Sequence, residues 1–101
     1  MAEVLKLEGD FSDFMPVKKG LYAKESLKVI AFHLRAGQRI ALHTSPYKVI
    51  TLVLKGEGEF FVGSEENRER LKSGEALIYE PMEPHGFVAL EDMAVLAFVI
   101  G

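Results

Sequence analysis

The side chains best suited to chemistry are the imidazoles of His43 and His85. A neutral imidazole binds Zn, Cu, Fe or Ni, and it exchanges protons near neutral pH. Residues two apart on an extended strand share a face, so every second residue after His43 should point the same way as His43. The residues in phase with His43 are Ser45, Tyr47 and Val49, although Pro46 favours a bulge in this stretch.

His33 is the third histidine, and its setting differs from that of the other two. It lies within an apolar run, between Phe32 and Leu34. Alternation places it on the opposite face from these two residues, which we expect to fill the interior. We therefore predict that His33 lies at a rim or in a dimer interface. The chain has no cysteine, so a thiolate nucleophile and a thiolate metal ligand are both excluded.

The composition predicts one soluble, folded domain over residues 1–101, with 49% hydrophobic and 27% charged residues. The net charge is −3, and acidic and basic residues are interspersed. This argues against nucleic acid, which requires a concentrated basic face, and against an anionic membrane surface.

Targeting signals are not apparent. The first ten residues lack the continuous apolar core of a signal peptide, and the longest apolar run, Met93 to Ile100, is too short to span a bilayer. We therefore expect a cytoplasmic protein. Gln38 and Asn67 are the only side-chain amides among many Glu and Lys residues, a pattern typical of thermophiles.

Short runs rich in β-branched and aromatic residues, separated by Gly and Pro turns, predict an all-β sandwich or barrel. The one helix-like stretch, Ser64 to Leu71, is short and follows a glycine turn. The charged residues within it are predicted to form a hairpin tip. The predicted strands are Gly20–Lys24, Leu27–Arg35, Arg39–His43, Val49–Lys55, Gly58–Val62, Arg68–Leu71, Ala76–Tyr79, His85–Leu90 and Met93–Ile100.

Several of these strands are apolar on both faces. Val29 to Phe32, Ile50 to Leu54 and Val95 to Ile100 are examples. A lone barrel needs only an apolar inner face, so something must cover the outer face as well. Another sheet of the same chain could do this, but in so short a chain we expect a homodimer.

Two glycine–histidine spacings resemble the two motifs of the cupin superfamily. In the first motif, G(X)5HXH(X)3–4E(X)6G, Gly37 and His43 take the first two positions and Gly56 takes the last. In the second, G(X)5PXG(X)2H(X)3N, Gly74 and His85 take the first glycine and the histidine positions. The motifs extend over about residues 37–58 and 74–89, and a spacer of 17 residues between Gly56 and Gly74 suits a compact member.

This resemblance implies a double-stranded β-helix, or jelly-roll barrel, with His43 and His85 in one cavity. Cupins usually hold a metal with three histidines and one glutamate. Here Ser45 stands at the second histidine position and Val49 at the glutamate position. His43 and His85 are therefore the two remaining candidates to bind Zn, Ni, Fe, Mn or Cu. The second motif departs too, with Glu80, Met82 and Ala89 at its proline, glycine and asparagine positions.

The predicted cavity combines these histidines with an apolar wall. Glu80 and Glu83 are expected to be solvated in the second loop, although either could act as an acid or base if it turned inward. The predicted lining residues are His43, Ser45, Tyr47, Val49, Phe60, Tyr79, Met82, His85, Phe87 and Phe98.

Three functions follow as alternatives. The first is a binding protein that holds a small organic ligand in the barrel, with the two histidines as polar anchors. The second, implied by the resemblance, is a metal-dependent oxygenase, isomerase or decarboxylase with an atypical ligand set. The third is a dimeric scaffold that interacts through the outer apolar face.

Overall fold

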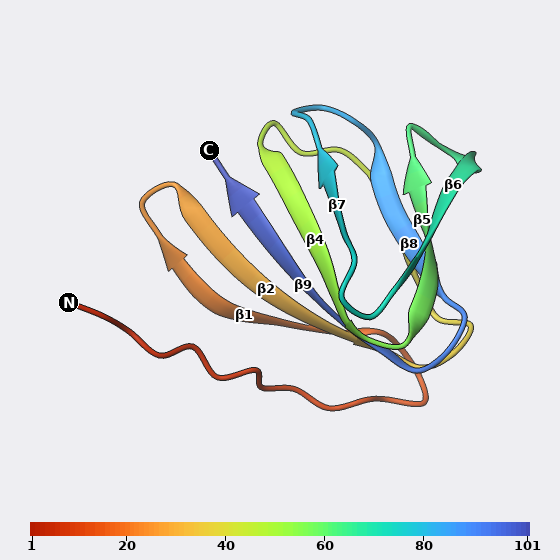
Figure 1. Cartoon of the computed structure of the whole chain (residues 1–101), viewed down its shortest axis with the longest axis horizontal. Helices are drawn as coiled ribbons and strands as arrows, with labels where there is room; N and C mark the ends of the chain where they lie inside the picture. The colour runs from red at the N-terminus through yellow and green to blue at the C-terminus, as the bar shows by residue number, and fades with distance from the viewer.

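The chain folds into nine strands and no helix (Figure 1). The structure is a computed structural model that describes all 101 residues. Because it has no helix, it has none long and apolar enough to cross a membrane. The strands are β1 (Val17–Lys24), β2 (Leu27–Leu34), β3 (Arg39–His43), β4 (Lys48–Lys55), β5 (Glu57–Val62), β6 (Ser64–Lys72), β7 (Ala76–Tyr79), β8 (His85–Ala89) and β9 (Met93–Ile100).

These strands form two antiparallel sheets that face each other. The larger sheet has the order β1-β2-β9-β4-β7, and the smaller has the order β3-β8-β5-β6. The predicted all-β class is confirmed, and seven of the nine strands start and end within one residue of the ranges expected from the sequence. The exceptions are β1, which begins three residues earlier, and β6, which includes the charged run expected at a hairpin tip.

The position of β6 at the edge of its sheet explains that second difference. This strand pairs with β5 alone and forms an edge of the smaller sheet, where charged side chains reach solvent and discourage pairing with another chain. The register of the β5–β6 pairing shifts between Phe61 and Val62, so the tip of this hairpin lies close to Gly63. A pattern of charges identifies an exposed segment but does not distinguish an edge strand from a turn.

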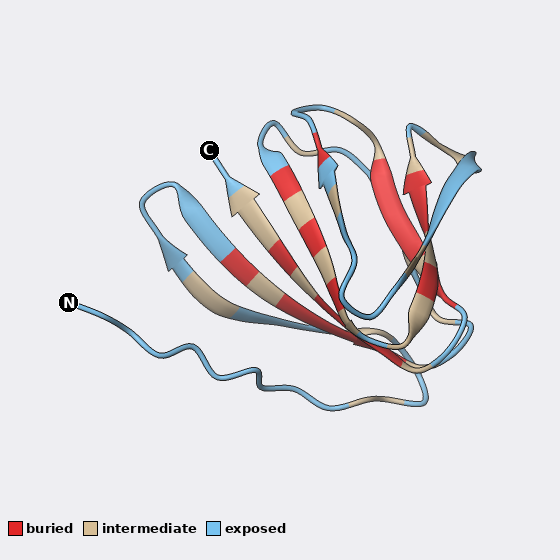
Figure 2. Cartoon of the chain, in the orientation of Figure 1, coloured by how far each residue is buried: buried red, intermediate tan, exposed pale blue.

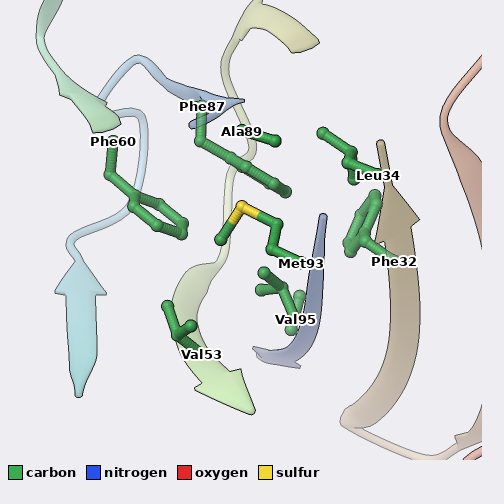
Figure 3. Packing of buried hydrophobic residues seen from close by; sticks show 9 residues of the cluster. Phe32, Leu34, Val53, Phe60, Phe87, Ala89, Met93 and Val95 are labelled. Atoms are coloured by element: carbon green, nitrogen blue, oxygen red, sulfur yellow. The ribbon is translucent and has the colours of Figure 1, made fainter. Parts of the chain in front are cut away.

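The hydrophobic core fills one end of the space between the sheets (Figure 3). Phe60 and Phe87 stack with ring centroids 4.7 Å apart, and Phe32 meets Phe87 edge-on at 5.8 Å. Aromatic rings in these arrangements pack more favourably than their buried area alone predicts. The full cluster is Phe32, Leu34, Val53, Phe60, Phe87, Ala89, Met93, Val95 and Ala97, with members from both sheets.

A polar contact joins two turns of the chain. The carboxylate of Asp92, between β8 and β9, accepts a hydrogen bond from the Ala36 amide at 2.9 Å and one from Nη1 of Arg35 at 2.8 Å. The Ala36 amide is the largest cause that lowers the pKa of Asp92, and the Arg35 hydrogen bond is the next. The folded state therefore stabilises the ionised form of the Asp92 carboxylate.

The stability conferred by Asp92 is expected to depend on pH. Because the pKa of Asp92 is lower in the folded state than its ordinary value of 3.8, its contribution is present above that value and is lost as the pH falls through the folded pKa. Asp92→Asn should therefore unfold at a lower temperature than the wild type at pH 7, and the difference should shrink below about pH 4. Thermal unfolding from pH 2.5 to 7 measures this, and a difference that is independent of pH would contradict it.

The segment before β1 covers part of the outer face of the larger sheet, and most of it is exposed (Figure 2). Lys19 pairs with Glu8 at 2.7 Å and Lys24 with Glu3 at 3.4 Å, which holds this arm, residues 1–16, along β1. The ring of Phe11 meets the ring of His33 edge-on, with centroids 5.3 Å apart.

The sequence predicted a rim or a dimer interface for His33. The residue is buried beneath the arm of its own chain, at 7% exposure, which corrects the rim position. A Cβ on Gly9 would lie 2.8 Å from its Nδ1, which shows how closely the arm backbone approaches the imidazole. The arm supplies part of the outer cover expected for two-sided strands. Ile50, Leu52 and Leu96 on β4 and β9 remain half-buried, and the homodimer stays a prediction.

Candidate functional site

A cavity of about 230 Å³ lies between the inner faces of the two sheets. Its base is made by the buried rings of Phe60 and Phe87, which also belong to the core. Exposed side chains line its other end, among them His43 and Tyr47. The barrel is therefore packed at one end and hollow at the other, with its polar groups near the opening.

Eight of the ten residues predicted from the sequence line this cavity. They are His43, Ser45, Tyr47, Val49, Phe60, Tyr79, His85 and Phe87. They come from both sheets, and the cross-strand register brings them together: Val49 is opposite Tyr79, and Phe60 is opposite Phe87.

Phe98 and Met82 do not line the cavity, and these two predictions are corrected. Phe98 lies on β9 between Ala97 and Val99, which do line it, so alternation turns Phe98 to the outer face. Met82 is 59% exposed in the loop between β7 and β8, where its φ of 67° bends the backbone through a left-handed turn. An apolar residue near a motif need not face the site that the motif forms.

Sequence reasoning missed two charged residues of the lining, Lys18 and Lys28. Lys28 shares the inner face of β2 with Ile30 and Phe32, and Lys18 is opposite Phe32 on β1. The signal was available, because Lys28, Ile30 and Phe32 are spaced two apart in the sequence. The histidine motifs include neither β1 nor β2, so they do not identify these lysines.

His43 and His85 form the centre of the polar end. They are direct cross-strand partners in β3 and β8, and their ring centroids are 4.2 Å apart. In each ring, Nδ1 meets a backbone carbonyl oxygen, that of Ala41 at 2.8 Å and that of Glu83 at 2.9 Å. A carbonyl oxygen only accepts, so Nδ1 carries the proton in both, and Nε2 of each neutral ring keeps its lone pair.

The two histidines differ in their surroundings. His43 is exposed, whereas His85 is only 7% exposed. Burial lowers the pKa of His85 below its ordinary value of 6.5, and the neighbouring His43 lowers it further, while its bond to the Glu83 carbonyl acts the other way. His85 is therefore a neutral imidazole at pH 7, suited to accept a proton or a hydrogen bond.

Tyr79 supports His85 and joins the sheets. Its ring centroid is 4.9 Å from that of His85, and its hydroxyl donates a hydrogen bond to the Phe61 carbonyl at 2.8 Å. Because Tyr79 belongs to the larger sheet and Phe61 to the smaller, this bond connects the two. Burial raises the pKa of the Tyr79 hydroxyl, as does the charge of Glu83, so it stays protonated and is not a base.

We expect Tyr79→Phe to lower the free energy of unfolding by about 1–3 kcal/mol, because it leaves the buried Phe61 carbonyl without this donor. Urea unfolding followed by circular dichroism measures the change. Tyr22→Phe is the control, since this half-buried tyrosine on β1 should change stability by less than about 0.5 kcal/mol. Equal effects of the two substitutions would contradict the role given to the Tyr79 hydroxyl.

The two glutamates of the β7–β8 loop lie outside the cavity lining. Glu80 lies 3.8 Å from Lys48 in an exposed ion pair. The carboxylate of Glu83 accepts a hydrogen bond from the Glu80 amide at 3.1 Å. Neither glutamate therefore provides an acid or a base within the cavity.

Residues 31–101 match the family model described as a cupin domain. The chain belongs to the cupin family. Among functionally curated proteins, none matches this cupin.

Solved structures support the jelly-roll fold of this cupin. An RmlC-like cupin protein from Desulfovibrio desulfuricans is 29% identical with a TM-score of 0.86, and the match covers 99% of this chain and 95% of that one. SPY1581, a conserved protein of unknown function from Streptococcus pyogenes, is 26% identical with a TM-score of 0.83, covering 99% and 88%. The DMSP lyase DddQ from Ruegeria pomeroyi, at 23% identity, a TM-score of 0.77 and 89% and 50% coverage, shares the fold.

The cupin fold implies a bound metal, which needs a suitable set of ligand side chains in the cavity. Nowhere in the structure do three or more His, Cys, Asp or Glu side chains come together as a metal site. The two imidazoles provide two ligands, Ser45 is a weak one, and Val49 is none. No carboxylate lines the cavity to offset the charge of a cation, and two lysines do line it. These residues do not fit the four-ligand metal site that is usual in cupins.

Proposed function

We propose that this cupin binds a small organic ligand inside its barrel, with His43 and His85 as polar anchors. The cavity between the sheets supports this most directly. Its volume of about 230 Å³ exceeds that of the engineered cavity of about 150 Å³ that binds benzene in another protein. A single ring with one or two substituents is therefore a suitable size of ligand.

The arrangement of polar groups supports the same function. Ligand sites combine mostly apolar walls with a few placed polar groups that orient the ligand. Here Phe60 and Phe87 provide the apolar base, while Nε2 of His43 and of His85 can accept a hydrogen bond from the ligand. A ligand with an apolar body and a polar end satisfies both regions.

Two neighbouring substitutions on β9 provide the test. Val99 lines the cavity, and Ile100 lies on the opposite face at 41% exposure. Saturation-transfer NMR with a mixture of benzoate, benzamide, phenylacetate and phenylacetamide should detect binding to the wild type and to Ile100→Phe. Val99→Phe, which places a ring in the cavity, should abolish it. Absence of binding to the wild type, or equal binding to both variants, would reject the proposal.

A second candidate is a metal-dependent cupin enzyme, and the paired imidazoles favour it. Two rings 4.2 Å apart, each with Nδ1 bonded to a carbonyl, are fixed in the tautomer that ligates through Nε2. Elemental analysis of untagged protein purified without chelators tests this. One metal per chain in the wild type and none in His43→Ala would support it, whereas equal metal contents would exclude ligation by His43.

A further inference from the structure

We propose that the ligand of this cavity is an organic acid that binds through a carboxylate at Lys18 and Lys28, an inference that rests on the proposed function and specifies its substrate class. The chain has 15 acidic residues and 12 basic ones, and its net charge is −3. Yet the cavity is lined by two lysines and by no aspartate or glutamate. The lining of this cavity in an acidic protein therefore presents positive charge to a ligand, from two exposed side chains.

The two lysines of the cavity differ from three of the four other lysines on the strands of the larger sheet, since only Lys55 among those four is also unpaired. Lys19 and Lys24, on the outer face of β1, and Lys48 on β4 each pair with a glutamate, at 2.7, 3.4 and 3.8 Å. Lys18 and Lys28 form no ion pair with any residue of the chain. Two ammonium groups are thus left without a counter-charge at this cavity.

The position of Lys18 connects the charge to the apolar region. Its ammonium nitrogen lies 6.0 Å from the centroid of the Phe32 ring, which lines the cavity and belongs to the core. A cation over an aromatic face is held by the ring quadrupole, so this lysine is directed over the cavity wall. A ligand packed against Phe32 would carry its carboxylate within reach of this group.

The hydroxyls of the cavity agree with an acid, while Nε2 of His43 and of His85 requires a donor elsewhere on the ligand. The hydroxyls of Thr51 and Tyr79 already donate to carbonyls, at 3.3 Å to Leu77 and at 2.8 Å to Phe61. The uncommitted donors that remain are the two lysines and the hydroxyls of Ser45 and Tyr47. A carboxylate accepts hydrogen bonds only, so it suits a set of free donors.

The kind of anion follows from the size and form of the site. The cavity has no arginine, whose planar fork suits phosphate, and the fold has no helix whose N-terminus could bind one. A volume of about 230 Å³ suits a monocyclic or short aliphatic body. The structure therefore favours a small carboxylic acid with an apolar body.

Matched pairs of probes test the proposal by isothermal titration at low salt. Each pair joins an acid to its neutral primary amide: benzoate with benzamide, and phenylacetate with phenylacetamide. We expect the acid to bind the wild type at least about tenfold more tightly than its amide, as charge-assisted hydrogen bonds require. In the double variant Lys18→Met, Lys28→Met, that ratio should fall to about one, because the acid loses more affinity than its amide.

The control is Lys19→Met, Lys24→Met, which removes the same charge from the outer face of the same hairpin and should keep the preference for the acid. If the acid and amide bind the wild type equally well, and Val99→Phe abolishes both, then the ligand is not anionic and the binding function stands. A preference that is lost equally in both double variants would also overturn the proposal, since net charge would explain it. If neither probe binds the wild type, both proposals fail.

Discussion

Phe60→Ala is expected to lower the free energy of unfolding by about 3–5 kcal/mol. Phe60 is fully buried, and its ring stacks on Phe87 with centroids 4.7 Å apart. Truncation removes the burial of a large aromatic side chain and leaves a void that neighbours from two hydrogen-bonded sheets can fill only in part. Domains of this size are stable by about 5–15 kcal/mol, so the variant would lose a large share of its stability.

Urea unfolding at several temperatures measures this loss. Phe14→Ala is the matched control, because the side chain of Phe14 is 96% exposed and its removal should change stability by less than about 0.5 kcal/mol. Phe60→Leu should lie between the wild type and Phe60→Ala. A loss below about 1 kcal/mol for Phe60→Ala would show that this end of the barrel is not packed as described.

Gly56→Ala is expected to have the second largest effect, a loss of about 2–5 kcal/mol. Gly56 has a φ of 82°, in the left-handed region that side chains disfavour. A Cβ there would also lie 2.3 Å from the backbone carbonyl oxygen of Asp92 and 2.9 Å from the Cβ of Met93. Backbone strain and overlap therefore add at the same position, and the obstructing atom is backbone that cannot rotate away.

Gly74 separates these two causes. Its φ of 91° is similar, but nothing lies within 4 Å of the position that a Cβ would take. Gly74→Ala should therefore lose only about 1–2 kcal/mol, the conformational part of the effect. Thermal and chemical unfolding of both variants, compared with the wild type, gives the difference. Equal losses at Gly56 and Gly74 would show that the close approach to Asp92 is unimportant.

The sequence predicted the strands well because glycine turns and apolar runs are local signals. Gly37, Gly56, Gly63 and Gly74 all have positive φ in the structure, and each lies at or beside a break between predicted strands. The start of β1 was missed because Val17 to Lys19 alternates weakly and includes two lysines. Their strand conformation depends on pairing with β2, which is a tertiary contact.

The candidate site was predicted in part, for a different reason. The motif spacings locate His43 and His85, and the antiparallel register makes them neighbours. Phe98 was placed on the wrong face because β9 is apolar on both sides, so hydrophobicity carries no information about phase there. The burial of His33 was missed because it depends on an arm that has no periodic pattern and packs through Phe11.

The packed base and hollow end of the barrel have a consequence for how such a protein can diverge. The residues that fold the chain, such as Phe60 and Met93, are fully buried at the base, whereas His43, Tyr47 and Lys28 near the opening are exposed. Substitutions of exposed residues change stability little. A duplicated copy could therefore change the residues around its opening and gain a new specificity while its folding remained intact. Directed evolution of this scaffold should begin at those positions.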